Sequence, residues 1–133
     1  YRKIATIMYL ILSGSLSKNA VLFWDEPETN MNPKMIRPLV DAIIELSRMG
    51  VQVFVTTHDY FVQQCFNMAA LYSNPGSERE KPLKYNFLSL YKDENNNIRF
   101  EQQEALSDLT HNAVMEEFDS LYDREQEMLY GRN

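Results

Sequence analysis

The sequence predicts an α/β fold, with a mostly parallel sheet flanked by helices, followed by a β-hairpin and a C-terminal helix. Three patterns support this prediction. Apolar residues recur at helical spacing at the start of the chain, two short apolar strands follow with an amphipathic helix between them, and a hairpin pattern precedes an acidic helical stretch. The order strand, helix, strand is typical of a right-handed crossover between parallel strands.

The composition fits one modest domain, or part of one. The chain has 133 residues, of which 44% are hydrophobic, enough for one core and too few for two comfortable domains. We therefore expect a single partial domain over residues 1–133, with a helix-strand-helix-strand core in 1–72 and the hairpin and C-terminal helix in 83–133. The net charge of -6 argues against this segment as the main contact for nucleic acid. A basic surface on a part of the protein outside this segment remains an open alternative.

The sequence also predicts a cytoplasmic protein that does not enter a membrane. Its single cysteine, Cys65, cannot form an internal disulfide and is expected to be a buried apolar filler. The apolar run from Ile4 to Leu12 is broken by Thr6 and is too short to span a bilayer. No cleavable signal pattern precedes it.

The first predicted helix lies at the very start of the chain. It ends at a turn marked by serine and glycine at residues 13–15, and its apolar stripe is formed by Ile4, Ile7, Met8, Ile11 and Leu12. Tyr1 is not a methionine, and no capping residue precedes the helix. We expect the chain to begin inside a longer protein.

Two strands and a helix are predicted next. The uninterrupted apolar run Ala20–Trp24 is typical of a central strand covered on both faces. Pro33 fits the first turn of the following helix, whose apolar stripe closes at Gly50. Val51–Thr56 is the second strand, and it should run parallel to the first.

The second half of the chain has weaker signals. A short helix should run from Phe61 to about Tyr72, and residues 73–82 should form an exposed loop. Strands are predicted at Tyr85–Lys92 and Ile98–Glu101 and should pair as a hairpin. An amphipathic helix with a solvated acidic face is predicted at Leu109–Leu129, either structural or for docking a partner. His111 is expected to be a surface or capping residue before that helix.

Three polar side chains follow the two predicted strands: Asp25 and Glu26 end the first, and His58 follows the second. Ligands bind at this edge in open α/β sheets. A carboxylate there can hold Mg2+, and a neighbouring carboxylate can orient or deprotonate a water for attack on a γ-phosphate. We predict Asp25 as the metal ligand, Glu26 as the base, and His58 as the group that reaches the transferred phosphoryl and holds the water in line.

These motifs resemble a known family. Residues 21–27, VLFWDEP, resemble the Walker B motif of ABC-type ATPases, including the SMC and double-strand-break-repair ATPases, and residues 53–59, VFVTTHD, resemble their switch histidine. The stretch DEPETNMNP at 25–33 is most similar to a bacterial branch with the overcoming-lysogenisation-defect nucleases and phage-defence ATPases. The resemblance covers Tyr1 to about Val62. It implies the C-terminal part of an ABC-type P-loop NTPase domain.

The resemblance implies ATP and Mg2+ as cofactors and a second ATPase subunit, in a homodimer or higher oligomer, as a partner. It also implies an effector nuclease or DNA-processing partner. Asn30, Met31 and Asn32 match the D-loop that faces the second subunit, although Asn32 replaces the usual aspartate or histidine. Arg2 and Lys3 fall just after the position of a signature sequence, and exposed charges in a first turn explain them equally well.

Glu28 and the phosphate-binding loop complete the set of candidates. Glu28 is predicted either to help place magnesium or nucleotide or to be a charge at a helix N-terminus. The chain contains no Gly-x-x-x-x-Gly-Lys-Ser/Thr sequence, whose amides and lysine bind phosphates in this class. We therefore expect the chain alone to bind ATP poorly.

Two other functions remain open at the level of sequence. A metal-dependent nuclease would use Asp25, Glu26 and Glu28 as a two-metal carboxylate cluster, but it gives His58 no purpose. A non-hydrolysing scaffold would bind nucleotide without releasing phosphate.

Overall fold

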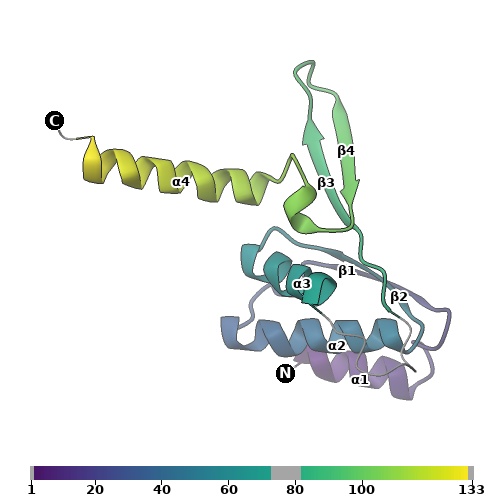
Figure 1. Ribbon diagram of the computed structural model, residues 1–133. Coiled ribbons are helices and arrows are strands. Elements are labelled where there is room, and N and C mark those ends of the chain that lie inside the picture. The colour runs from purple at the N-terminus through teal and green to yellow at the C-terminus, as the bar shows by residue number, and fades with distance from the viewer. Residues whose placement is uncertain (1, 73–81, 132–133) are drawn as a thin grey trace. The chain divides into compact units, whose positions relative to one another are not determined.

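A computed structural model of the chain describes residues 2–72 and 82–131. These residues form two compact units, 1–83 and 84–133, each described by itself below (Figure 1). Tyr1 and the predicted loop, apart from Pro82, lie outside the described residues. Within the described part of the chain, no helix is both long enough and apolar enough to cross a membrane.

The first unit contains the predicted alternation of helices and strands. Its elements are α1 (Arg2–Leu12), β1 (Val21–Asp25), the 3-10 turn η1 (Pro33–Met35), α2 (Ile36–Arg48), β2 (Gln52–Thr56) and α3 (Tyr60–Tyr72). The helix, strand, helix, strand order predicted for residues 1–72 is confirmed, and α3 begins one residue before the predicted start.

β1 and β2 pair in parallel, as the crossover predicts. The register sets Val21 beside Gln52 and runs in step to Asp25 beside Thr56. The carboxyl ends of both strands therefore lie at one edge of the sheet. The described residues form a mixed α/β structure, and a parallel pair of two strands is too small to identify a larger sheet.

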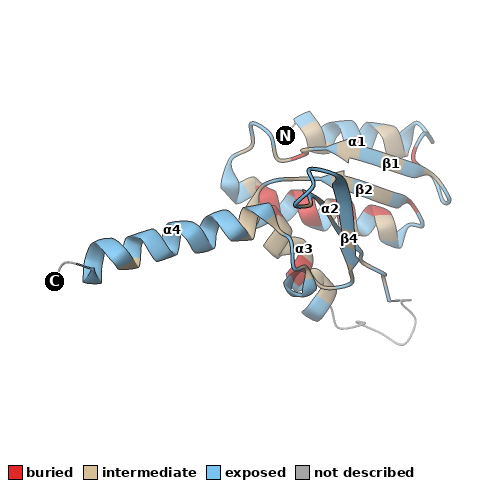
Figure 2. Cartoon of the chain, turned by 90° about the horizontal axis from the view of Figure 1, so that it is seen from above, coloured by how far each residue is buried: buried red, intermediate tan, exposed pale blue. Residues whose placement is uncertain are grey.

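α1 and α2 cover one face of the β1–β2 pair, and α3 packs on α2. One core cluster joins α1 to α2 and the sheet, and its buried members are Ile7, Leu16, Leu46 and Val51, with the inward side chains of both strands packed against them. A second cluster joins α2 to α3 through Ile36, Val40 and Val62. Figure 2 shows buried residues along α2, which contributes to both clusters.

The expectation that the first strand is covered on both faces is wrong for these residues. Side chains alternate along each strand, and the face turned away from α1 and α2 carries Phe23 and Phe54, which are 76% and 43% exposed. Their rings stack with centroids 4.7 Å apart. An unbroken apolar run indicates that both faces prefer burial but cannot show that both are covered within the same segment.

Local chemistry sets the ends of α2. The helix proper begins at Ile36 because Pro33–Met35 form a 3-10 turn, which the side chain of Asn32 caps by accepting from the Lys34 amide at 3.0 Å. At the other end Gly50 has φ +93°, and a Cβ there would lie 2.9 Å from Cγ of Lys18. Glycine therefore allows the tight return from α2 into β2.

The second unit is a hairpin followed by a long helix. β3 (Phe87–Lys92) and β4 (Ile98–Gln103) pair antiparallel, which confirms the predicted hairpin with small shifts at its ends. The carboxylate of Asp93 organises the turn by accepting from the amides of Asn95 and Asn97 at 3.0 and 2.8 Å. Arg99 pairs with the same carboxylate at 2.9 Å.

The C-terminal helix, α4 (Ala113–Tyr130), starts four residues later than predicted, after a 3-10 turn, η2 (Leu106–Asp108). Asn112 caps it by accepting from the amides of Val114 and Met115, so of the two roles predicted for His111 the structure supports the surface position and not the cap. His111 instead stacks on Tyr91 with ring centroids 3.8 Å apart. None of the side chains of α4 is buried.

A single carboxylate holds the chain between the hairpin and α4. Glu101 accepts from the Thr110 amide at 2.9 Å, from the Thr110 hydroxyl at 3.0 Å and from the His111 amide at 3.1 Å. The backbone hydrogen bond from Thr110, the largest cause, lowers the pKa of Glu101 from 4.5 to about 2. These bonds favour the charged form of the carboxylate.

This clamp gives a pH prediction for the second unit. Because the pKa of Glu101 is lowered in the folded state, its contribution to stability is complete above pH 4.5 and is lost as the pH falls toward about 2. An NMR titration of the Glu101 side-chain carboxyl should show a midpoint near 2, and the amides of Thr110 and His111 should shift with it. In Glu101→Gln those two amides should no longer respond over this range. A midpoint near 4.5 would contradict the clamp.

Candidate active site

The parallel register places the predicted catalytic residues at one edge of the first unit. Asp25 is the last residue of β1 and lies beside Thr56, the last residue of β2. Glu26 and His58 leave the two strands directly afterwards. The loops that carry them follow β1 and β2 in Figure 1.

Each acidic residue at the end of β1 or in the loop after it pairs with a different residue at the end of β2 or in the loop that follows. His58 Nδ1 lies 2.6 Å from Glu26 Oε1. The Thr56 hydroxyl donates to Asp25 Oδ1, and the Thr57 hydroxyl lies 2.5 Å from Glu28 Oε1 and donates to it. The structure thus brings Asp25, Glu26 and His58 to one place, and it adds Glu28 through Thr57.

The pair formed by Glu26 and His58 is open to solvent. The two side chains are 39% and 76% exposed, respectively. A carboxylate only accepts hydrogen bonds, so Nδ1 of His58 must donate to it, which leaves Nε2 to bond another group. An incoming ligand can therefore reach both groups without displacing protein atoms that cover them.

The backbone of Glu26 is held in an unusual conformation. Its φ is +44°, in the left-handed region that residues other than glycine seldom adopt. The Glu26 amide donates to the Thr56 carbonyl at 3.0 Å and to the Thr56 hydroxyl at 3.1 Å. Such conformations persist only where surrounding contacts fix them, and they gather at functional sites. Here Thr56 provides the fixing contacts.

Lys3 has a contact that the sequence did not reveal. Its ammonium donates to the carbonyls of Pro27 and Thr29, both at 2.5 Å, and so ties α1 to the turn that carries Glu26 and Glu28. The view of Lys3 as an exposed charge in a first turn is therefore incomplete. Sequence spacing gave no signal for it, because the contact joins residues 24 and 26 positions apart.

The residues matched to a D-loop form a local turn in this structure. Asn30 has φ +60°, the Met31 amide donates to the Glu28 carbonyl at 3.0 Å, and Asn32 caps the turn before α2. Asn30 and Asn32 are exposed, and Met31 is half-buried. The capping role explains an asparagine at position 32 without any contact to a second subunit.

The donor chemistry at this edge fits magnesium held together with a phosphate. Asp25 is exposed, and the hydrogen bonds of the described residues use only one of its carboxylate oxygens. Glu28 Oε2 is buried and has no hydrogen-bond partner among these residues. Mg2+ favours oxygen ligands and is often bound by one or two carboxylates plus phosphate. Asp25 would hold it, directly or through a water, and Glu28 is a second oxygen donor nearby in sequence.

The same residues do not form a metal cluster of their own. Over residues 2–72 and 82–131, no group of three or more histidine, cysteine, aspartate and glutamate side chains is arranged to hold a metal ion. Asp25, Glu26 and Glu28 bond to three different partners, which is not the shared geometry of a two-metal site.

Cys65 is the candidate thiol of the chain. Cys65 is a free, half-buried cysteine that packs against the cluster between α2 and α3, and burial raises the pKa of its thiol. The expected role as an apolar filler agrees with this packing. Raised pKa and burial make a thiol a poor nucleophile.

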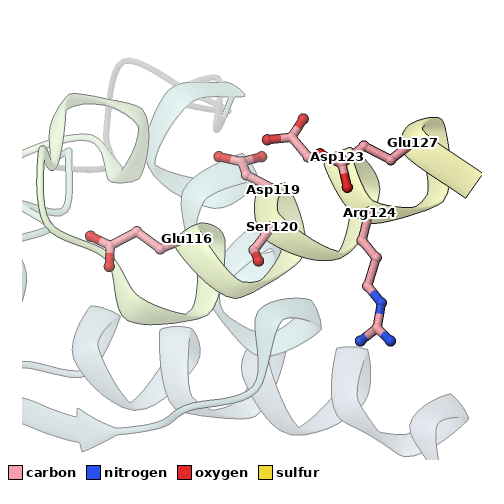
Figure 3. A pocket seen from close by; sticks show the side chains of 6 residues that line it. All are labelled: Glu116, Asp119, Ser120, Asp123, Arg124 and Glu127. Carbon is pink, nitrogen blue, oxygen red and sulfur yellow. The ribbon is translucent and has the colours of Figure 1, made fainter. Parts of the chain in front are cut away.

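α4 carries an open hollow in the second unit. Figure 3 shows its lining, which consists of Glu116, Asp119, Ser120, Asp123, Arg124 and Glu127. All six side chains come from one helix, so the hollow is a solvated acidic face and not an enclosed site. This agrees with the solvated face predicted for the tail.

Residues 3–62 match the family described as AAA domain, putative AbiEii toxin, Type IV TA system. The match spans α1 to the start of α3, and with it the whole β1–β2 edge, but under half of the chain. No curated protein and no solved structure matches the chain significantly.

The match supports an AAA-type P-loop ATPase family for this segment and does not select a branch within that family. It supports a nucleotide-binding, ATPase-type function in general terms. ATPases of this kind generally use ATP and Mg2+, in agreement with the oxygen donors at the β1–β2 edge.

Proposed function

We propose that this chain supplies the hydrolytic half of an ATP site, in an ABC- or SMC-like head that dimerises around nucleotide. The observation that carries the proposal is the 2.6 Å contact between His58 and Glu26, beside Asp25, at the carboxyl ends of two parallel strands. It lies within the segment that matches the AAA domain. Ligands of open α/β sheets bind at this edge.

The proposed mechanism assigns one task to each side chain. Glu26 accepts a proton from the attacking water and orients it toward the γ-phosphate. His58, held by Glu26 through Nδ1, uses Nε2 to contact the transferred phosphoryl group. Asp25 would hold a magnesium ion, which when bound would neutralise charge on the phosphates. The strand register sets Asp25 beside Thr56, and the loops that carry Glu26 and His58 begin from this fixed pair.

The proposal includes partners that complete the site. The phosphate-binding amides and lysine would come from residues outside this chain, because the chain itself contains no such sequence. A second ATPase subunit would face the turn at Asn30, Met31 and Asn32, two of which are exposed. We further propose that hydrolysis gates an effector nuclease or a DNA-processing partner, in phage defence or DNA repair in the cytoplasm. This step rests on motif resemblance.

One experiment separates the proposed function from its alternatives. The purified full protein should release phosphate from ATP when Mg2+ is present and should stop when EDTA removes it. Cleavage of DNA with Mg2+ and without ATP would instead support a nuclease, and the separate bonding of the three carboxylates argues against that result. Tight ATP binding without phosphate release, with DNA and the natural partner added, would overturn hydrolysis in favour of a scaffold.

A further inference from the structure

The hydroxyl of Thr56 bonds to both residues that carry the proposed chemistry. It accepts from the backbone amide of Glu26 at 3.1 Å and donates to Oδ1 of Asp25. A hydroxyl can donate one hydrogen bond, and the Asp25 carboxylate accepts it. The bonds therefore run in one direction, from the Glu26 amide through the Thr56 oxygen to the Asp25 carboxylate.

The position of Thr56 at the end of β2 allows it to bond to both Asp25 and Glu26. Thr56 is the last residue of β2 and lies in register with Asp25, so its side chain can reach across the strand pair at the edge. The Glu26 amide also bonds to the Thr56 carbonyl, at 3.0 Å. One residue therefore satisfies the amide of Glu26 twice, at the point where φ is +44°.

We propose that Thr56 is a positioning residue for this site. Its hydroxyl holds the carboxylate of Asp25 and the backbone of Glu26 in fixed positions relative to each other. The inference rests on the proposed ATPase function. Without the hydroxyl, Asp25 loses the bond that selects its side-chain orientation, and Glu26 loses one of the two bonds that hold its left-handed backbone. Asp25, the proposed metal ligand, and Glu26, the proposed base, are then no longer held at a fixed relative position. This should lower the affinity for Mg2+ and the turnover rate more than the affinity for nucleotide.

Two substitutions separate the hydroxyl from the shape of the side chain. Thr56→Val keeps a β-branched side chain of the same size but removes the hydroxyl, whereas Thr56→Ser keeps the hydroxyl and removes the methyl group. Thr56 is exposed, so neither change disturbs a packed core. In the full protein, Thr56→Val should lower kcat about tenfold or more, as expected for the loss of a hydrogen bond to a charged group. KM for ATP should stay within about threefold, since the hydroxyl does not bind the nucleotide.

Magnesium dependence supplies a readout that a purely structural role would not move. With a non-hydrolysable ATP analogue present, Thr56→Val should bind Mg2+ more weakly than the natural protein in a calorimetric titration, and it should need a higher Mg2+ concentration for half-maximal rate. Thr56→Ser should match the natural protein in kcat, in Mg2+ binding and in Mg2+ dependence. The inference is overturned if Thr56→Val matches the natural protein, or if Thr56→Ser is as impaired as Thr56→Val. If Thr56→Val does not fold by circular dichroism, Thr56→Ala compared with Thr56→Ser repeats the test with two small side chains.

The outcome also separates this inference from the proposed function. If the natural protein fails to hydrolyse ATP, the proposed function is wrong and the role of Thr56 falls with it. If the natural protein hydrolyses ATP, Glu26→Gln is inactive and Thr56→Val is fully active, only the positioning role is wrong.

Discussion

Glu26→Gln should abolish turnover in the full protein while leaving ATP binding intact. Glutamine has the size of glutamate and can still contact His58, but it cannot take a proton from water. General bases typically contribute about 100-fold to 10,000-fold to a rate, so kcat should fall within that range. Phosphate release under saturating ATP and Mg2+ measures kcat, and a fluorescent ATP analogue measures binding.

A matched control tests whether the loss belongs to Glu26. Glu45→Gln makes the same chemical change on α2, where Glu45 is 69% exposed and forms only a surface ion pair with Arg48. Exposed pairs of this kind contribute little, so Glu45→Gln should hydrolyse ATP at the natural rate. If nucleotide drives dimerisation, Glu26→Gln should also accumulate as a dimer with ATP bound. A natural rate in Glu26→Gln would remove Glu26 from the role of base.

The convergence of Asp25, Glu26 and His58 could be predicted from the sequence because it depends on two strong signals. Apolar runs of strand length fix β1 and β2, and the helix between them requires the strands to be parallel. Parallel strands end at the same edge, so polar residues that follow each strand must meet there. This topology brings the loops with Glu26 and His58 to the edge where the 2.6 Å contact forms.

The residues that support this convergence could not be predicted in the same way. The contact of Lys3 with the turn after β1 depends on how α1 packs, and no periodic pattern reports the reach of one side chain. The bonds of Thr56 depend on a one-residue register between strands, which the sequence does not fix. α4 starts later than the sequence predicts, because Glu101 accepts from the amides of Thr110 and His111 before the helix begins. These are long-range polar contacts, which local propensity does not contain.

The exposed side of the β1–β2 pair illustrates a further limit. An apolar strand reports that burial is favourable on both faces, but the pattern does not say which residues provide the cover. Phe23 and Phe54 stack on each other and remain exposed. Whether a strand is buried therefore depends on the segments that pack against it, and the sequence of the strand alone does not determine its burial.

His58→Ala should lower kcat about 100-fold, and its effect should not add to that of Glu26→Gln. The structural reason is the single contact that joins the two groups, in which Nδ1 of His58 bonds to Oε1 of Glu26 at 2.6 Å. Removing the imidazole leaves Glu26 without the partner that orients it, and in Glu26→Gln the imidazole can still contact residue 26 but has no base to orient. Residues that act as a unit lose most of their function when either one is changed.

A double-mutant cycle measures this coupling. The double variant Glu26→Gln/His58→Ala should be about as slow as the slower single variant, since coupled neighbours deviate from additivity by about 0.5–3 kcal/mol. If the two effects multiply, the groups act independently and the contact at 2.6 Å has no role in turnover. The other histidine of the chain provides the control, because His111 stacks on Tyr91 in the second unit. His111→Ala should leave kcat unchanged, which separates loss of the Glu26 partner from loss of a histidine in general.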